Sequence, residues 1–276
     1  MRVARFARPG GDPTFGIVEL EADGGQHPNT VAAVAADPLV AGAKTTDAVK
    51  FTGARHDLAD VRLLAPVIPR SKVVAMGRNF ADHVSEMGTK GPTTPVVFIK
   101  PNTSVIGPDQ PVIKPVETSH LSYEGEVGIV IGRICRRVPP ERAADVIFGY
   151  TCANDVTARD LQSAEDQWTR AKGFDTFCPL GPWIETELTV EQASCLRIVT
   201  TVDGQVRQDG NTADTVLSIP QIISFVSGFT TLLPGDVLLT GTPRGVGRIE
   251  AGQRVSIEIE HIGALVNVVA DEAGNG

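Results

Sequence analysis

The sequence predicts a mainly β fold of the α+β class, in which a mixed β-sheet forms a sandwich or roll. Two observations carry this prediction. Alternating or β-branched runs fill the last third of the chain and are separated by Gly, Asp and Asn turns, as in short strands. A single helix candidate, residues 218–232, interrupts these runs, and strands do not alternate with helices as they do in βαβ repeats. A large mixed sheet is therefore favoured over a doubly wound parallel sheet.

The first 68 residues predict a small N-terminal module that is rich in strands. The segments MRVARFA and FGIVELE alternate in polarity, and an alanine-rich stretch covers residues 30–43. Pro66 and Pro69 then mark a joint between two parts of the chain. A second, larger domain is expected to span residues 69–276.

The second domain begins with short apolar runs that predict buried strands. These runs are KVVAMG at residues 72–77, PVVFIKP at 95–101 and SYEGEVGIVIG at 122–132. A helix is predicted from Pro139 to Asp145, because its Pro-Pro-Glu start suits a first helical turn. The strand VIFGYTCAN follows at residues 146–154 and ends in a polar turn.

Charge and composition limit the partners that the chain can have. A formal net charge of −8, without a basic stripe, opposes binding to nucleic acid. No apolar run is long enough to span a bilayer, and the N-terminus lacks the apolar centre of a signal peptide, so we expect a cytoplasmic protein. The four cysteines show no zinc-site spacing. A small molecule is the expected partner.

Two glutamates stand at the start of the most apolar strand. Because side chains alternate along a strand, Glu124 and Glu126 point the same way, while Tyr123 and Val127 point the other way. Two like charges entering a buried strand are costly without a cation. The simpler alternative is that the pair lies at a frayed, solvated strand start.

A third carboxylate follows a neighbouring strand. Asp155 comes directly after VIFGYTCAN, where it can join Glu124 and Glu126 in a site made only of oxygen ligands. Such ligands suit Mg²⁺ or Mn²⁺, with Ca²⁺ as a further candidate, and the absence of nearby Cys or His argues against zinc. Taken alone, this grouping only suggests a cation site, and the solvated strand start stays open as the alternative.

The segment GRNFADHVSEMG predicts a short helix that carries a histidine and a glutamate on one face. His83 and Glu86 are three residues apart, so the carboxylate can orient the imidazole as a general base. An exposed pair on a surface helix is the alternative. Gly77 and Gly88 flank the segment and would let it move as a lid.

Two further stretches are candidates for substrate contacts. Lys172 precedes the apolar segment FCPLGPW, so its ammonium group can be drawn into a pocket, although surface lysines are more common. In LLTGTPRGVG, the backbone N–H of Gly241 and the hydroxyl of Thr242 can meet an anion. A glycine-rich hairpin loop is the alternative for this second stretch.

Taken in order, these stretches resemble the fumarylacetoacetate hydrolase family. The resemblance is carried by GRNFADHVSEMG, PVVFIKP, YEGEVGIVIG, GYTCANDVTARDLQ, AKGFDTFCPLGPW and LLTGTPRGVG, within residues 70–269. It implies a mixed β-roll catalytic domain, usually dimeric, and it is closest to the smaller bacterial members. The long members have a larger N-terminal domain and a further aspartate ligand, which has no convincing match here.

The family resemblance also implies roles for particular residues. It implies that Glu124, Glu126 and Asp155 hold Mg²⁺ or Mn²⁺, so we expect the glutamates to face a divalent cation rather than solvent or a salt bridge. It also implies that His83 and Glu86 form a catalytic dyad on a mobile lid, that Lys172 is the active-site lysine, and that Gln162 and Thr242 contact the substrate. Arg159 lies in the same motif as Gln162, and it either contacts the substrate or braces the metal loop.

The family resemblance implies a metal-dependent hydrolase that cleaves a C–C bond of an acylpyruvate-type 2-oxo acid. A divalent cation held by the three carboxylates would act as a Lewis acid on the 2-oxo group and favour an enolate at the adjacent carbon. The alternatives in the same site are a 2-hydroxyhepta-2,4-diene-1,7-dioate isomerase or decarboxylase and an oxaloacetate decarboxylase. The contrasting class is a catalytically silent small-molecule binder with a structural cation.

Overall fold

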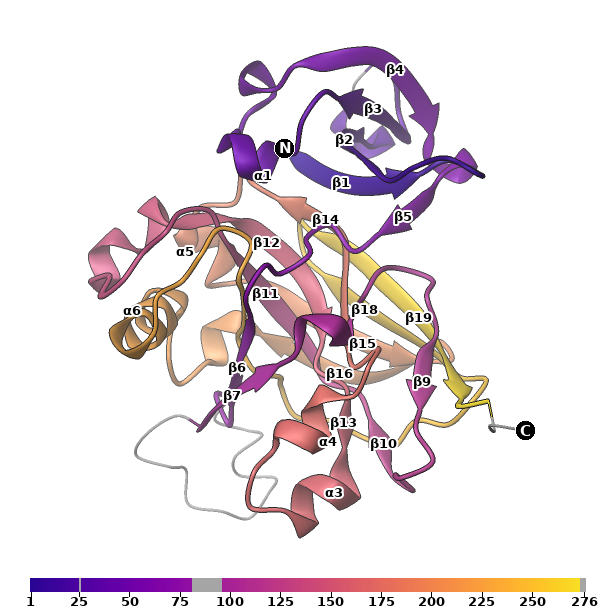
Figure 1. Ribbon diagram of the computed structural model, residues 1–276, viewed down its shortest axis with the longest axis vertical. Coiled ribbons are helices and arrows are strands. Elements are labelled where there is room, and N and C mark those ends of the chain that lie inside the picture. Colours follow the sequence, from indigo (N-terminus) through magenta and orange to yellow (C-terminus); the bar gives the residue numbers. More distant parts are fainter. Residues whose placement is uncertain (25, 81–95, 274–276) are drawn as a thin grey trace.

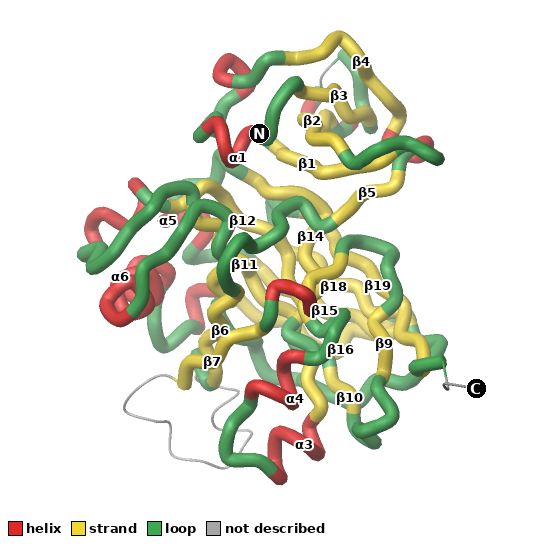
Figure 2. Tube along the Cα trace, viewed as in Figure 1, coloured by secondary structure: helices red, strands yellow, loops and turns green. Residues whose placement is uncertain are grey.

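The computed structural model describes residues 1–24, 26–80 and 96–273, and it consists mainly of strands in mixed sheets (Figure 1). The predicted mainly β, α+β fold is confirmed. Strands occupy the centre of the molecule in Figure 2, and the helices are short segments around them. None of the described helices is long and apolar enough to cross a membrane.

The largest sheet runs through the whole molecule and combines the N-terminal strands with those of the second domain. Its strands, in spatial order, are β4 (Phe51–Asp57), β3 (Thr30–Val34), β2 (Thr14–Glu19), β1 (Arg2–Ala7), β14 (Cys178–Glu185), β12 (Ile147–Asn154), β11 (Gly125–Ile131), β17 (Val237–Leu239), β6 (Val73–Gly77) and β7 (Val96–Lys100). Two short strands lie beside this path, with β5 (Arg62–Leu64) paired to β1 and β8 (Val105–Ile106) paired to β14. Most of these pairings are antiparallel, and β17 pairs with β6 in parallel.

Two smaller sheets complete the β-structure. The second sheet contains β16 (Gln205–Asn211), β15 (Arg197–Val202), β18 (Arg254–Ile259), β19 (Gly263–Asp271) and β9 (Val112–Lys114). The third consists of β10 (Leu121–Ser122) and β13 (Thr157–Ala158). The large sheet packs against the second one through a shared apolar core, as in a β-sandwich or roll.

The helical segments are short and connect the strands. The α-helices are α1 (Pro38–Ala41), α3 (Arg159–Ala164), α4 (Thr169–Gly173), α5 (Val190–Ala193) and α6 (Ile219–Phe229). The 3₁₀ helices are η1 (Glu21–Asp23), η2 (Thr46–Ala48), η3 (Leu58–Asp60), η4 (Asn102–Ser104), η5 (Pro140–Asp145) and η6 (Thr212–Asp214). The helix predicted from Pro139 to Asp145 corresponds to η5, which is a 3₁₀ helix, and the helix predicted over residues 218–232 corresponds to α6.

The N-terminal strands extend the large sheet instead of forming a sheet of their own. Strand β1 pairs with β14 through Arg2 and Val3, which lie opposite Glu185 and Ile184. The ammonium group of Met1 adds an ion pair, because its nitrogen lies 2.8 Å from Glu185 Oε1. Strand pairing and a buried charge therefore both tie the N-terminal strands to β14 of the same sheet.

Strand β11 lies at the centre of the molecule and is buried on both faces. Val127 and Ile129 face the core between the two larger sheets, while Val130 faces a separate core on the opposite side. The residues before the strand keep this alternation, since Tyr123 joins the same core as Val127. Every residue of the neighbouring strand β12 is also buried. The predicted doubly covered strand is confirmed.

Gly125 separates the two glutamates and faces the second sheet at close range. A Cβ atom at this position would lie 2.2 Å from Thr200 Oγ1 and 3.3 Å from Gln208 Oε1. Real Cβ atoms do not approach other atoms that closely, so any side chain here would push β11 and β15 apart. Glycine therefore allows the second sheet to pack directly behind the two carboxylates.

We expect Gly125→Ala to lower the free energy of unfolding by about 1–3 kcal/mol, because the added methyl group overpacks this contact. The measurement is urea unfolding of both single variants and of Gly125→Ala combined with Thr200→Ala. The double variant should recover part of the loss, because Thr200→Ala removes the clashing Oγ1 atom. Strictly additive effects of the two substitutions would contradict this account.

Candidate active site

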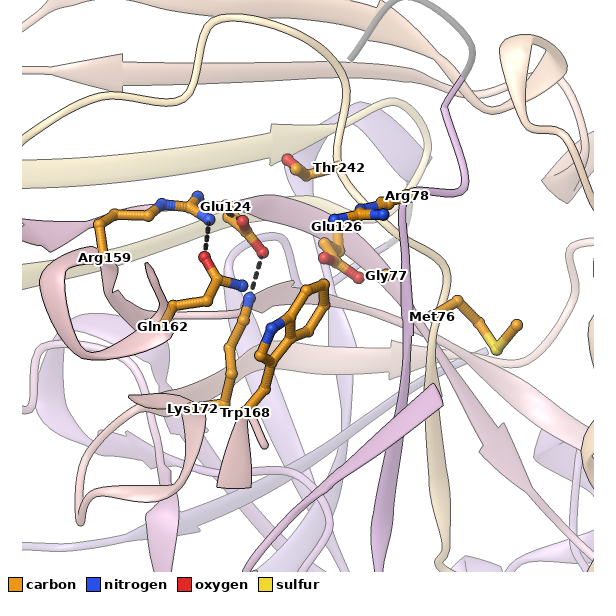
Figure 3. A pocket seen from close by; sticks show the side chains of 10 residues that line it. All are labelled: Met76, Gly77, Arg78, Glu124, Glu126, Arg159, Gln162, Trp168, Lys172 and Thr242. Carbon is orange, nitrogen blue, oxygen red and sulfur yellow. Dashed lines mark hydrogen bonds and ion pairs between the residues drawn. The ribbon is translucent and has the colours of Figure 1, made fainter. Parts of the chain in front are cut away.

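A single pocket brings together most of the residues that the sequence identified. Six of the candidates line it, namely Glu124, Glu126, Arg159, Gln162, Lys172 and Thr242, and their neighbours in the wall are Met76, Gly77, Arg78 and Trp168. Figure 3 shows Arg159, Gln162, Lys172 and Trp168 gathered around Glu124 and Glu126, while Met76 points away from them. Two other candidates, His83 and Glu86, lie outside the described residues.

Pairing between β11 and β12 places the third carboxylate beside the two glutamates. The N–H of Glu124 donates to Asn154 Oδ1 at 2.9 Å, and the N–H of Asp155 donates to the Glu124 carbonyl at 2.9 Å. These reciprocal bonds fix the chain where β11 begins and β12 ends. Asp155 therefore lies next to Glu124 although the two residues are far apart in the sequence.

The three carboxylates form a compact and buried cluster. One oxygen from each of Glu124, Glu126 and Asp155 lies within 4.8 Å of the others, and all three side chains are buried. Carboxylate oxygens gathered in this way are the ligands that Mg²⁺, Mn²⁺ and Ca²⁺ prefer. The donor set therefore fits a hard divalent cation, and the predicted grouping of these residues is observed.

Two basic residues contact this cluster from α3 and α4. Lys172 Nζ lies 2.7 Å from Glu124 Oε2 and 2.6 Å from Asp155 Oδ2, so it bridges two carboxylates. Arg159 pairs with Glu124 Oε1 through Nη2 and holds Gln162 Oε1 through Nη1 at 2.9 Å. The expectation that no salt bridge would accompany the glutamates is wrong for Glu124. Lys172 is buried, so its default assignment to the surface is excluded as well.

Glu126 differs from the other two carboxylates because it has no ion pair among the described residues. Its Oε2 accepts a hydrogen bond from the N–H of Gly241 at 2.7 Å. Burial raises the pKa of Glu126 well above its ordinary value, and the nearby charges of Asp155 and Glu124 raise it further. A bound cation would reverse this effect by stabilising the ionised form.

Lys100 is a part of the site that the sequence reasoning missed. It ends strand β7, is completely buried, and its Nζ lies 2.5 Å from Asp155 Oδ1 and 2.5 Å from the Lys172 carbonyl. The ammonium group therefore neutralises Asp155 and also fixes the backbone that carries Lys172. The alternation of side chains along the strand could have predicted that Lys100 is buried. Lys100 shares a face with buried Phe98, while Ile99 between them is exposed.

The glycine-rich stretch LLTGTPRGVG was expected to bind an anion through the Gly241 N–H and the Thr242 hydroxyl. In the structure both groups bind other parts of the protein. The N–H of Gly241 already binds the carboxylate of Glu126. The Thr242 hydroxyl donates to the Gly125 carbonyl at 2.9 Å and accepts from Gln208 Nε2 at 2.8 Å. Gln208 Oε1 in turn accepts from the Gly125 N–H at 3.0 Å, so this stretch braces both glutamates.

Comparison with known families identifies two matches that together cover most of the chain. The model described as fumarylacetoacetate (FAA) hydrolase C-terminal matches residues 72–270, and the model described as Rv2993c-like, N-terminal matches residues 1–66. The protein Rv2993c of Mycobacterium tuberculosis is 49% identical over 269 residues, which cover 98% of both chains.

Solved structures show the same fold over the whole chain. A 5-carboxymethyl-2-hydroxymuconate delta-isomerase from Mycobacterium smegmatis is 46% identical with a TM-score of 0.86, and the match covers 99% of this chain and 100% of that one. A maleylpyruvate hydrolase from Sphingobium sp. SYK-6, solved with manganese(II) and pyruvate, is 31% identical with a TM-score of 0.77 and the same coverage.

We expect Lys100→Met to lower the free energy of unfolding by about 3–5 kcal/mol in the presence of EDTA, because it leaves the buried Asp155 carboxylate without this partner. Lys114→Met is the matched control, since Lys114 pairs with a half-exposed Glu250 and should cost about 1 kcal/mol or less. Urea unfolding measures both changes. Equal losses for the two variants would contradict the assigned role of Lys100.

We expect cation binding to strengthen as the pH rises. The raised pKa of Glu126 means that this ligand keeps its proton where ordinary carboxylates are ionised, and the proton competes with a cation. Without metal, ionisation of Glu126 costs stability, so the melting temperature in EDTA should fall as the pH passes through the raised pKa. The gain in melting temperature from Mn²⁺ should therefore grow as the pH rises above the ordinary pKa of a carboxyl group. Glu126→Gln should remove both trends, and their persistence in that variant would refute the assignment.

Proposed function

Because the chain belongs to the fumarylacetoacetate hydrolase family, we propose that it is a divalent-metal-dependent enzyme acting on 2-oxo acids or their enols. The proposed reaction is hydrolysis of a C–C bond in an acylpyruvate-type substrate. The observation that carries the proposal is the buried triad of Glu124, Glu126 and Asp155. Glu124, Glu126 and Lys172 line one pocket, and Asp155 adjoins it through its ion pair with Lys172. Buried carboxylates gathered around an open pocket are costly for stability alone, which favours a functional role.

Glu124, Glu126 and Asp155 would hold the cation, with Mg²⁺ or Mn²⁺ as the proposed ion. A divalent cation bound there would act as a Lewis acid on the 2-oxo group of the substrate. The relative from Sphingobium sp. SYK-6 was solved with manganese(II) and pyruvate, which supports both the class of ion and the class of ligand. The raised pKa of Glu126 also fits a ligand that is ionised by metal binding.

The basic residues of the pocket would stabilise negative charge on the substrate. Lys172 carries its ammonium group into the pocket wall, where water is largely excluded and electrostatic stabilisation is strong. Arg159 is braced by Glu124 and by Gln162, so its remaining donors can be directed at a carboxylate. Gln162 and the hydroxyl of Thr242 line the same pocket and can add hydrogen bonds to the substrate.

His83 and Glu86 are proposed to supply the base that removes a proton from water. Their spacing lets the carboxylate orient the imidazole, and the segment that carries them follows strand β6 and Phe80. Proton transfer to His83 would let hydroxide attack the distal carbonyl carbon. The C–C bond would then break, and its electron pair would leave with the pyruvate fragment.

Isomerisation is a second candidate function for the same pocket. It is supported by the 46% identity to the structure described as a 5-carboxymethyl-2-hydroxymuconate delta-isomerase. Isomerisation and decarboxylation need the same polarised 2-oxo group but no attacking water. A panel of acylpyruvates, oxaloacetate and dienedioates, assayed with Mg²⁺ and with Mn²⁺, distinguishes these reactions by their products.

We expect Glu126→Gln to abolish metal-dependent turnover on this panel without lowering stability. Glutamine is neutral and similar in shape, so it removes a metal ligand but also removes the cost of a buried charge without an ion pair. Turnover should fall at least about 100-fold, the Kd for Mn²⁺ should rise at least about tenfold, and the melting temperature in EDTA should not fall. Glu258→Gln, on the exposed face of β18, is the control and should change none of these quantities.

Two outcomes of this experiment would reject the proposed function. Unchanged turnover in Glu126→Gln would exclude the triad as the reactive metal site. A wild-type protein that unfolds on metal removal but turns over no member of the panel would instead be a silent binder with a structural cation. His83→Ala separates the proposed base from the metal site, because it should lower hydrolysis while leaving the Kd for Mn²⁺ unchanged.

A further inference from the structure

Arg78 lines the pocket but has no part in the chemistry described so far. It follows the last residue of β6, Gly77, and lies in the same wall as Glu126 and Trp168. Figure 3 shows Arg78 and Arg159 on opposite sides of the two glutamates in this view. The pocket therefore has one arginine on each flank of the carboxylate cluster.

The backbone at Arg78 is held in an unfavourable conformation. Its φ angle of 60° lies in the left-handed region, which costs a non-glycine residue on the order of 1 kcal/mol or more. The next residue, Asn79, is fixed by three hydrogen bonds, including one from Nδ2 to the Thr240 carbonyl at 2.8 Å. Phe80 is buried in the core directly after it. The surrounding fold thus enforces a strained turn that a glycine would adopt more easily.

Two aromatic rings connect Arg78 to the carboxylate cluster. The Arg78 guanidinium carbon lies 5.9 Å from the centre of the Trp168 ring, and Trp168 makes an edge contact with Phe98 at 5.5 Å. Lys172 Nζ lies over the other ring of this pair, 4.9 Å from the centre of Phe98. Gly77 leaves room for the arrangement, because a Cβ atom there would lie 2.6 Å from the Trp168 ring. Both cations are therefore held against packed aromatic rings.

Arg78 differs from the other pocket cations because no carboxylate of the described residues neutralises it. Lys172 pairs with Glu124 and Asp155, and Arg159 pairs with Glu124. Arg78 forms no ion pair within the described part of the chain, and its Nε atom is buried without a hydrogen-bond partner. A buried donor without a partner costs about 1–3 kcal/mol, and an anionic ligand at this position would remove that cost.

The balance of charge around the pocket also favours a ligand with more than one negative charge. Among the described residues at or beside the pocket, the cations are Arg78, Lys100, Arg159 and Lys172, and the carboxylates are Glu124, Glu126 and Asp155. Within this described set, positive charge exceeds negative charge by one when all seven groups are ionised, and a divalent cation would increase that excess. A 2-oxo acid with a single carboxylate would neutralise only part of this excess positive charge.

We propose that Arg78 is a specificity-determining residue that binds a second carboxylate of the substrate, at the end remote from the 2-oxo group. This inference rests on the proposed function, because the metal site would hold the 2-oxo acid end. The Arg78 guanidinium would form a charge-assisted pair with the remote carboxylate, and the Trp168 ring would keep the guanidinium in position. The substrate class is therefore a 2-oxo dicarboxylate and not a simple alkyl or aryl acylpyruvate.

The test compares matched pairs of 2-oxo acids as ligands of the Mn²⁺-loaded protein. Titration calorimetry gives the Kd of 2-oxoglutarate and 2-oxopentanoate, of 2-oxoadipate and 2-oxohexanoate, and of 2-oxopimelate and 2-oxoheptanoate. The members of each pair differ only by the remote carboxylate. At one or more chain lengths, we expect the wild type to bind the dicarboxylate about 10- to 100-fold more tightly than its partner.

Arg78→Met should remove this advantage while the Kd values of the monocarboxylates and of Mn²⁺ change less than about threefold. Arg78→Lys keeps the charge without the planar fork of donors and should retain part of the advantage. The matched control is Arg137→Met, since Arg137 also has a left-handed backbone, with φ of 53°, but is exposed outside the pocket. This control should behave as the wild type.

Three results would overturn the inference. The first is equal binding of both members of every pair by the wild type. The second is an advantage for the dicarboxylates that persists in Arg78→Met. The third is the absence of Mn²⁺-dependent binding for all the acids, which would reject the proposed function together with this inference, whereas the first two results leave the proposed function intact.

Discussion

The need to neutralise three buried carboxylates is the constraint on which the rest of the site depends. Glu124, Glu126 and Asp155 are buried at the wall of the pocket, so each charge must be compensated by a cation or by hydrogen bonds. The protein meets this need unevenly. Lys100 and Lys172 compensate Asp155, Lys172 and Arg159 compensate Glu124, and Glu126 has only the N–H of Gly241 among the partners described. Glu126 is therefore the carboxylate whose negative charge a bound metal ion would stabilise most.

The surrounding architecture follows from the same requirement. Strands β11 and β12 must meet where Glu124 and Asp155 can exchange backbone contacts, and Gly125 must allow the second sheet to approach from behind. Strand β7 must end at Lys100 so that a buried ammonium group reaches both Asp155 and the backbone of Lys172. Contacts to a few charged atoms thus link β7, the short helix α4 and the turn after β17 at the site.

The sequence was sufficient for the features that depend on local pattern. Strand alternation predicted that Glu124 and Glu126 share a face, and the end of the neighbouring strand led to Asp155. The sequence was insufficient for contacts between residues that lie far apart in the chain. Lys100 reaches Asp155 across 55 residues, and its importance becomes evident only once β7 is known to lie beside α4. The salt bridges of Glu124 were missed for the same reason, because they depend on helices whose placement no local pattern fixes.

The hydrogen bond from Gly241 to Glu126 joins residues that are 115 positions apart. During synthesis, a chain that emerges N-terminus first contains all three carboxylates long before it contains the N–H group that holds one of them. The complete ligand geometry, including the hydrogen bond that holds Glu126, therefore becomes available only after the segment that contains Gly241 has been synthesised and has packed beside β11.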